Sequence, residues 1–378
     1  MNESISYVGL DVHKSFIQVA LIPAGTNDVV EWRTPNTPSK VAAMLRKLAR
    51  LGGARVELCY EAGPTGFGLA RKLQEHPGFR CKVIAPSLIP TKPGERIKTD
   101  RRDARKLAWY LKSGLLTEVQ PPTPDEEARR ELCRARGAAK DDEKRAKHRL
   151  SKFLLRHSLR FTGTKNAWTK PHMIWLDQQK FENPYMQRVF DTLLRALNQA
   201  ADRVAELDRA IEEMAKDPEV AELVSLVQCF KGVALVTATS LVTELYNIER
   251  FRKPRGLMSY LGLTASEHST GGNPRRGGIT KAGNSRVRKL LMEVAWNHSR
   301  SNKTGTLLRR RREGQPGWAV DLGERAQHRL HRRFWRLVRN GKHQNKAACA
   351  VAREFAGFLW TMLLSHRLQV HKTPEAAA

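Results

Sequence analysis

Short apolar runs at the start of the chain constrain its fold more than any other feature. The segment SYVGLDVHKSFIQVALI, residues 6 to 22, holds two β-rich runs separated by the polar turn DVHKS, which predicts a hairpin. A third run, near residues 28 to 33, can extend the hairpin to a three-stranded meander. Asp11 is then expected near the end of the first strand.

After the meander, helices and strands are predicted to alternate. The helix VAAMLRKLARLG stops at Gly52 and Gly53, and the strand ARVELCYEAG that follows carries Glu61 near its end. A helix at TGFGLARKLQEH, a strand at RCKVIAPS and a helix beginning near Asp100 complete the order βββαβαβα. This order predicts a mixed α/β sheet with helices on its faces, as in ribonuclease H-like (RuvC-like) nucleases, although fold order alone does not decide function.

The remaining chain is predicted to be mainly helical. The Pro-rich stretch VQPPTPDEE ends the first domain, and helical periodicity in residues 125–160 and about 185–216 predicts a long, coiled-coil-like connector. In the last part, QCFKGVALVTATSLVTEL reads as two helices around Gly232, a helix-hairpin-helix-like element whose backbone N–H groups can hold a phosphate. The expected domains are residues 1–120, 121–218 and 219–378.

Charge points to a polyanionic partner. Lys and Arg total 67 against 38 Asp and Glu, a net charge of +29, spread over the whole chain, and 40% hydrophobic residues argue against a disordered binder. The five cysteines are far apart and form no C-x-x-C pair, which fits a reducing cytoplasm. The longest apolar runs are too short to span a bilayer, so no membrane partner is expected.

Four acidic residues could hold a metal ion: Asp11, Glu61, Asp100 and Asp103. Asp100 and Asp103 are three residues apart on one predicted helix, so both carboxylates project from the same face. Carboxylates this close raise one another's pKa, and a divalent cation keeps them ionised; Mg²⁺ suits an all-oxygen set. Two such ions can stabilise the attacking and leaving oxygens of a phosphodiester. The residues alone also allow a structural interpretation, in which Asp11 caps a turn and the other acids favour a helix N-terminus.

Several segments resemble one family. YVGLDVHKSFIQVAL, CYEAGPTGFGLARKL and KTDRRDARKLA resemble the N-terminal DEDD domain of bacterial insertion-sequence transposases described as RNA-guided bridge recombinases. FKGVALVTATSLVTEL and FRKPRGLMSYLGLTASEHSTGGNPRRGGITKAGNSRVRKLL resemble that family's transposase domain. The resemblance implies that the four acids are the metal ligands and that a serine of the Gly-rich segment is the nucleophile. Ser269 is the first choice, with Thr270 and Ser266 as alternatives; His268 could shuttle protons, although a lone histidine is more often structural.

The resemblance further implies a transposase that excises and inserts its own mobile element through a phosphoserine intermediate. It also implies guidance by an element-encoded noncoding RNA and a homo-oligomer, dimer or tetramer, in which two subunits complete each active site. Two rivals are a junction-resolving or repair nuclease that uses only the four carboxylates, and a non-catalytic nucleic-acid binder. The basic and polar residues expected to bind nucleic acid are Lys98, Arg101, Arg102, Arg105, Arg275, Arg276, Lys281, Asn284 and Arg286.

Overall fold

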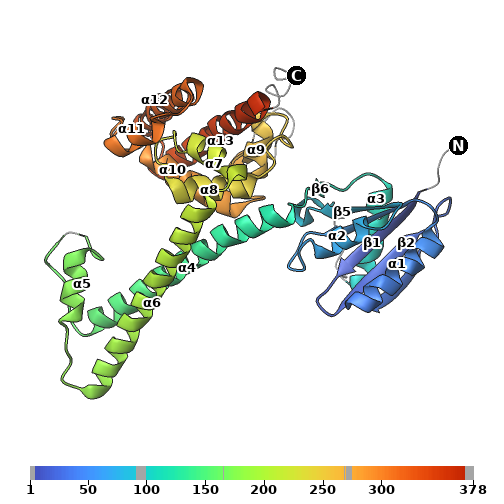
Figure 1. Cartoon of the computed structure of the whole chain (residues 1–378), viewed down its shortest axis with the longest axis horizontal. Helices are drawn as coiled ribbons and strands as arrows, with labels where there is room; N and C mark the ends of the chain where they lie inside the picture. Colours follow the sequence, from blue (N-terminus) through green and yellow to red (C-terminus); the bar gives the residue numbers. More distant parts are fainter. Residues whose placement is uncertain (1–4, 91–98, 165, 268, 270–274, 371–378) are drawn as a thin grey trace. The chain divides into compact units, whose positions relative to one another are not determined.

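The computed structural model describes residues 5–90, 99–164, 166–267, 269 and 275–370. Contacts divide the chain into two compact units, Met1–Pro122 and Thr123–Ala378. Figure 1 shows a sheet with helices in the first unit and almost only helices in the second. The prediction of a mixed α/β domain followed by a largely helical remainder is therefore confirmed.

A six-stranded sheet with the order β3-β2-β1-β4-β5-β6 forms the N-terminal unit. Its first three strands are an antiparallel meander, β1, β4 and β5 are parallel, and β6 runs antiparallel to β5. The sequence prediction missed β6, which has two residues and lies beside the predicted Pro-rich break. The elements are β1 Ser6–Val12, β2 Phe16–Ile22, β3 Val30–Pro35, α1 Pro38–Gly52, β4 Val56–Glu61, α2 Gly68–Gln74, β5 Phe79–Ile84, a 3-10 turn Pro86–Leu88, α3 Asp100–Lys112 and β6 Glu118–Val119.

Helices cover both faces of this sheet. Val41, Met44 and Leu48 of α1 join α2 and one set of strand side chains in an apolar cluster. On the opposite face, Ala104 and Ala108 of α3 pack against β2, while other apolar residues of α3 pack against β4 and β5. The central strands β1 and β4 are therefore covered on both faces, which accounts for the consecutive buried residues in each of them.

The C-terminal unit begins with two long helices. A capping box at Thr123 and Glu126 starts α4, and an aromatic cluster that includes Phe153, Phe181 and Phe190 joins the far end of α4 to α6. The division of this unit into a connector and a transposase domain stays a prediction. The elements are α4 Pro124–Arg156, α5 Lys170–Asp177, α6 Pro184–Met214, α7 Pro218–Val227, α8 Leu235–Leu245, α9 Pro254–Tyr260, β7 Ala265–Glu267, β8 Arg276–Ile279, α10 Ser285–Asn297, α11 Thr306–Arg312, α12 Gly317–Arg339 and α13 Gln344–Val370.

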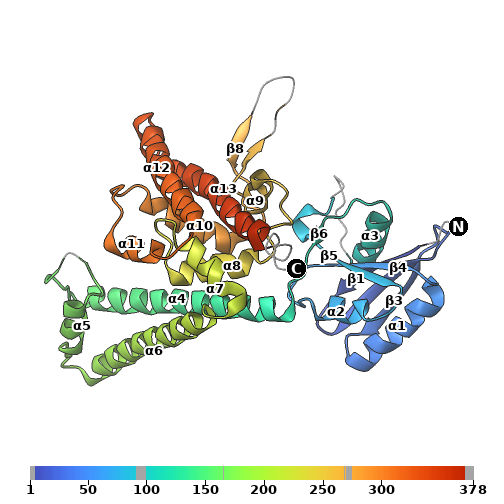
Figure 2. The same cartoon turned by 45° about the horizontal axis from the view of Figure 1, so that its top comes forward.

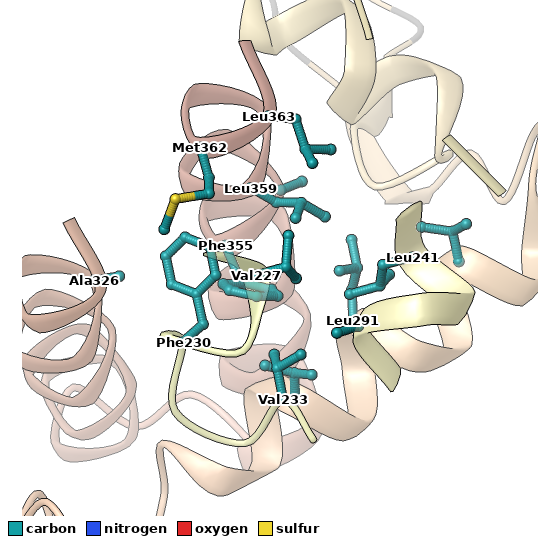
Figure 3. Close-up of a cluster of buried hydrophobic side chains, with 14 of the residues drawn as sticks. Val227, Phe230, Val233, Leu241, Leu291, Ala326, Phe355, Leu359, Met362 and Leu363 are labelled. Carbon is teal, nitrogen blue, oxygen red and sulfur yellow. The ribbon is translucent and has the colours of Figure 1, made fainter. Parts of the chain in front are cut away.

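The core of the C-terminal unit surrounds α13. Phe355, Leu359 and Met362 of this helix lie among side chains of α7, α8, α10 and α12 (Figure 3). By length and composition α13 could cross a membrane, and it is the single such helix among the described residues. Half of its most apolar stretch is buried inside the unit, so packing against the neighbouring helices accounts for its apolar composition.

Two helices with a turn at Gly232 are confirmed. α7 and α8 flank this glycine, whose φ is 84°. A Cβ there would lie 2.9 Å from the side chain of Asn297, so both the backbone conformation and the close neighbour favour glycine.

Candidate active site

The register of two parallel strands places Asp11 beside Glu61. Leu10 pairs with Tyr60, so Asp11 and Glu61 are the next residues along β1 and β4. Side chains two residues apart on a strand share a face. Glu61 therefore shares its face with Cys59, whose thiol contacts the Leu107 carbonyl oxygen of α3 at 3.6 Å. Both acids project toward the α3 side of the sheet.

Gly9 allows α3 to approach this face closely. A Cβ at Gly9 would lie 2.1 Å from the Ala104 carbonyl oxygen and 2.5 Å from the Ala108 nitrogen, distances that no side chain tolerates. Asp11 lies two residues beyond Gly9 on the strand, and Asp100 lies one helical turn before Ala104 on the same helix face. The close contact at Gly9 thus brings the beginning of α3 over the end of β1.

Asp11, His13 and Asp100 come together at this point, and we name them the Asp11 cluster. Their ligand atoms lie within 4.8 Å of one another. His13 Nε2 is 3.1 Å from Asp11 Oδ2 and 3.5 Å from Asp100 Oδ1, and its ring stacks on Phe16 with centroids 4.5 Å apart. Glu61 and Asp103 do not belong to this group.

Sequence reasoning missed His13, although a signal was present. The residue follows Asp11 by two positions, so an extended chain places both on one face. The confirmed β1–β2 hairpin then holds it, because the His13 N–H donates to the Phe16 carbonyl oxygen at 2.9 Å and Asn36 Nδ2 donates to the His13 carbonyl oxygen at 2.8 Å.

The electrostatics of the Asp11 cluster fit a cation. Burial raises the pKa of Asp11, His13 opposes the rise, and the nearby carboxylates of Asp100 and Asp103 add to it. Carboxylates that disfavour one another's charge are stabilised by a divalent ion bound between them. Carboxylate oxygens suit Mg²⁺, and an imidazole nitrogen can also ligate or orient a ligand. The donor set at the end of β1 is therefore able to hold a divalent metal ion.

Two of the basic residues predicted to meet nucleic acid beside this cluster are held by an acid of the sheet. Arg105 donates to both Glu31 carboxylate oxygens, at 3.0 and 2.8 Å, and Arg101 also donates to Glu31. Although burial raises it, the pKa of Glu31 is lowered overall by these hydrogen bonds. Arg102 is exposed, and Lys98 lies outside the described residues. A phosphate would have to compete with Glu31 for Arg101 and Arg105.

The predicted serine nucleophile lies beside a short hairpin, β7–β8. Ser269 is exposed; its Oγ donates to Glu267 Oε1 at 2.8 Å and accepts from the Arg275 N–H at 3.3 Å. Figure 2 shows the hairpin standing out from the helices of the C-terminal unit. Ser266 instead donates to the Gly278 carbonyl oxygen across the hairpin at 3.3 Å. The alternatives Thr270 and His268 lie outside the described residues.

Sequence reasoning also missed Glu267, the carboxylate partner of Ser269. It lies two residues before Ser269 in EHSTGG, a spacing that was visible. Glu267 also lies 3.5 Å from Arg276. A serine hydroxyl needs a base or a metal to become a good nucleophile, and Glu267 is the described acceptor in contact with this one.

The remaining residues predicted to bind nucleic acid follow the hairpin. Asn284 caps α10 by accepting from the Arg286 and Val287 N–H groups at 3.0 and 3.1 Å, and its Nδ2 donates to buried Glu244 at 2.8 Å. This capping role accounts for Asn284 within the fold. Arg275, Arg276, Lys281 and Arg286 are exposed, as a contact with a phosphate backbone requires.

Carboxylates clustered at the end of a central strand, in a chain of net charge +29, define an enzyme that acts on the phosphodiesters of a nucleic acid. Comparison with known proteins identifies its family. Residues 8–158 match a model described as "Transposase", for the DEDD domain of IS110 elements, and residues 224–308 match "Transposase IS116/IS110/IS902 family".

Relatives match most of the chain. "Putative transposase y4qE" of Sinorhizobium fredii is 38% identical over 94% of this chain and 88% of its own length. The transposase for insertion sequence element IS1533 of Leptospira borgpetersenii is 31% identical over 88% of this chain and 96% of its own. The chain therefore belongs to the IS110/IS116 family of transposases, and it is an enzyme that acts on DNA.

Proposed function

We propose that this transposase excises and inserts a mobile element in the cytoplasm by Mg²⁺-dependent strand cleavage and exchange through a phosphoserine intermediate. In this proposal the N-terminal unit is a ribonuclease H-like (RuvC-like) domain, and Asp11, Glu61, Asp100 and Asp103 hold the metal. The observation that carries the proposal is the convergence of Asp11, His13 and Asp100 at the end of β1. When bound there, Mg²⁺ would neutralise charge that develops on the phosphate oxygens.

His13 and the sheet position the ligands. The 3.1 Å contact from His13 Nε2 to Asp11 Oδ2 fixes the orientation of the carboxylate that burial has partly removed from water. Partners of this kind orient ligand carboxylates and histidines in metal sites. Glu61 lies beside Asp11 in the register of β1 and β4, and Asp103 lies three residues after Asp100 on α3, which supports both as further ligands in this proposal.

Ser269 is the proposed nucleophile. Its Oγ attacks the phosphorus of one DNA strand, the bond from phosphorus to the leaving deoxyribose oxygen breaks, and that oxygen takes a proton from water to become a hydroxyl. Glu267, which accepts from the Ser269 hydroxyl at 2.8 Å, receives the serine proton. A hydroxyl of another strand then attacks the phosphoserine and loses its proton to water. The new phosphodiester forms, the bond from phosphorus to Ser269 Oγ breaks, and Glu267 returns its proton to Ser269.

Guidance by an element-encoded RNA and assembly into a dimer or tetramer complete the proposal. The charge of +29 supports binding of two polyanions, because backbone contacts need no reading of bases by the protein. Sequencing of RNA that copurifies with the protein tests the guide. A discrete RNA whose reprogramming redirects insertion supports it, whereas recombination that proceeds without RNA contradicts it.

The metal chemistry is tested by Asp11→Asn beside the control Asp28→Asn, an exposed acid of the same unit. We expect Asp11→Asn to lower Mg²⁺-dependent cleavage by a factor on the order of 10²–10³, the cost of losing one charge-stabilising group in an active site. Asp28→Asn should cleave normally. Unchanged cleavage by Asp11→Asn in a normally folded protein would sink the metal assignment. Absence of Mg²⁺-dependent cleavage by the wild-type protein would favour a non-catalytic binder.

Ser269→Ala distinguishes a recombinase from a nuclease. We expect the variant to bind Mg²⁺ and DNA normally while it loses strand exchange and the covalent protein–DNA adduct that denaturing gels detect. Separate Thr270→Ala and Ser266→Ala variants should retain the adduct. Normal cleavage by Ser269→Ala with no adduct in the wild type would instead support a nuclease that uses only the carboxylates.

A further inference from the structure

An arginine-rich groove lies along α12, in a region without a role in the chemistry above. The helix buries Ala319, Leu322, Ala326, Leu330 and Phe334 on one face. Its outer face lines a groove of about 1020 Å³ together with Glu354 of α13. We name it the α12 groove; its main lining residues on α12 are Trp318, Arg325, Arg329, Arg332, Arg333 and Arg336.

The arginines form a line rather than a scattered patch. Arg325, Arg332 and Arg336 are seven and four residues apart, which places them on one helix face. At 1.5 Å per residue this line is about 16 Å long. One strand of a DNA duplex carries one phosphate per roughly 3.4 Å of helix axis, and an unpaired strand can extend further, so the line is long enough to meet more than one phosphate.

The cations of the α12 groove exceed what its acids neutralise. Three acids line the groove beside five arginines. Glu354 pairs with Arg329 and Arg333, the latter at 2.9 Å, Glu324 pairs at 3.2 Å with Arg312, which is not a lining residue, and Asp321 lies four residues before Arg325. Within the described part of the chain, no acid pairs with Arg325, Arg332 or Arg336, and all three are exposed. Unpaired guanidinium groups in a line are suited to phosphate oxygens, which they bind through two parallel N–H donors.

Trp318 adds a second kind of contact. It lies at the N-terminal end of the groove, seven residues before Arg325 and on the same helix face, and its ring is partly buried against the core. Proteins bind unpaired strands by combining a basic groove with aromatic rings on which bases stack. In a duplex both faces of a base are already stacked, so a tryptophan at the end of the line favours an unpaired strand.

We propose that the α12 groove binds an unpaired DNA strand, with phosphates on Arg325, Arg332 and Arg336 and a base stacked on Trp318. A transposase that cleaves DNA generates strand ends that must be held until they are joined. The proposal rests on the DNA partner given by the family and is independent of the metal and Ser269 chemistry. Its test therefore uses full-length Asp11→Asn protein, in which the DNA stays intact.

The first test compares two triple variants that each remove three positive charges. Arg325→Gln/Arg332→Gln/Arg336→Gln removes the three arginines of the groove that no acid pairs with, and Arg195→Gln/Arg300→Gln/Arg310→Gln changes exposed arginines that lie outside the groove and outside α12. Binding of a labelled oligothymidylate is measured against salt. We expect the groove triple to lower the slope of log affinity against log salt by about 2 and the affinity at 0.1 M salt by about 100-fold. The control should bind nearly normally, because distant surface charges are screened at this salt. Equal losses in both triples would overturn the proposal.

A second test locates the base. Trp318→Ala should weaken oligothymidylate binding by roughly 5- to 150-fold, the range for one lost stacking contact, and Trp318→Phe should retain most of it. Photocrosslinking of a bromodeoxyuridine oligonucleotide should label the tryptic peptide 313–325, which contains Trp318. Labelling elsewhere with no loss in Trp318→Ala overturns the stacking contact. The groove triple variant is also tested with an oligouridylate RNA. Weaker binding of oligothymidylate supports the proposal whether or not RNA binding also falls, whereas a loss of oligouridylate binding alone contradicts it.

Discussion

The Asp11 cluster and the Ser269 hairpin carry two halves of the proposed chemistry, and the fold supports them differently. Asp11 lies on a central strand between two helix-covered faces, and Asp100 begins a helix that packs so closely on that strand that no Cβ fits at Gly9. Ser269 lies beside a hairpin of three- and four-residue strands, and the nearest described residues before and after it, Glu267 and Arg275, are exposed. The Asp11 cluster is therefore held by elements that pack in the core, whereas the Ser269 side chain is held by two hydrogen bonds.

The two regions differ in how precisely their reactive groups must be positioned. Metal ligands must converge within a fraction of an ångström, which rigid elements provide. A nucleophile that must reach a phosphate on a bound strand can lie on a loop, since loops carry reactive groups on a rigid scaffold. Substitutions that act through packing should therefore disable the Asp11 cluster and spare the Ser269 hairpin.

The largest expected effect on the comparison comes from a glycine substitution beside the Asp11 cluster, with a matched glycine substitution in the hairpin. Gly9→Ala places a methyl group 2.1 Å from the Ala104 carbonyl oxygen, so α3 must move. We expect a loss of about 1–3 kcal/mol in the free energy of unfolding. Cleavage should fall by about 10²-fold, because a shift of about 1 Å in an active site has that cost. Calorimetry and metal-dependent cleavage measure the two effects.

Gly278→Ala is the matched change in the hairpin. A Cβ at Gly278 meets no atom within 4 Å, so the free energy of unfolding should change by no more than about 0.5 kcal/mol. Gly68→Ala, also in open space, controls for a glycine change within the N-terminal unit itself. Equal effects of Gly9→Ala and Gly278→Ala would remove the distinction between the two regions.

A smaller effect is expected from His13→Ala. The substitution leaves every carboxylate in place but removes the group that contacts Asp11 Oδ2 and stacks on Phe16. Loss of such an orienting partner weakens metal affinity by about 10- to 100-fold. We therefore expect the Mg²⁺ concentration for half-maximal cleavage to rise by that factor, with activity restored at high Mg²⁺. Failure of excess Mg²⁺ to restore activity would mean that His13 does more than orient Asp11.

The difference between local and distant contacts also explains which features the sequence predicts. The β1–β2 hairpin with its DVHKS turn and the start of α3 at Asp100 were predicted correctly, because both depend on residues that are neighbours in the chain. The contact between Gly9 and Ala104 joins residues 95 positions apart, and nothing local signals it. The helix α12 could also have been predicted, because its buried residues Ala319, Leu322, Ala326 and Leu330 occur at helical spacing between its many arginines.

The last prediction concerns the contact between Ser269 Oγ and Glu267 in the hairpin. Glu267→Gln keeps an oxygen that can accept from Ser269 Oγ but removes the negative charge that would take the proton. A general base contributes about 10²–10⁴-fold to a rate, so adduct formation should slow by at least about 10²-fold. The rate of the covalent adduct measures this, with Glu249→Gln, a glutamate distant in sequence in the same unit, as the control. Because Glu267 also lies 3.5 Å from Arg276, an Arg276→Gln variant separates the two contacts: if it slows the adduct as much as Glu267→Gln does, the hairpin needs the ion pair rather than a base beside the serine.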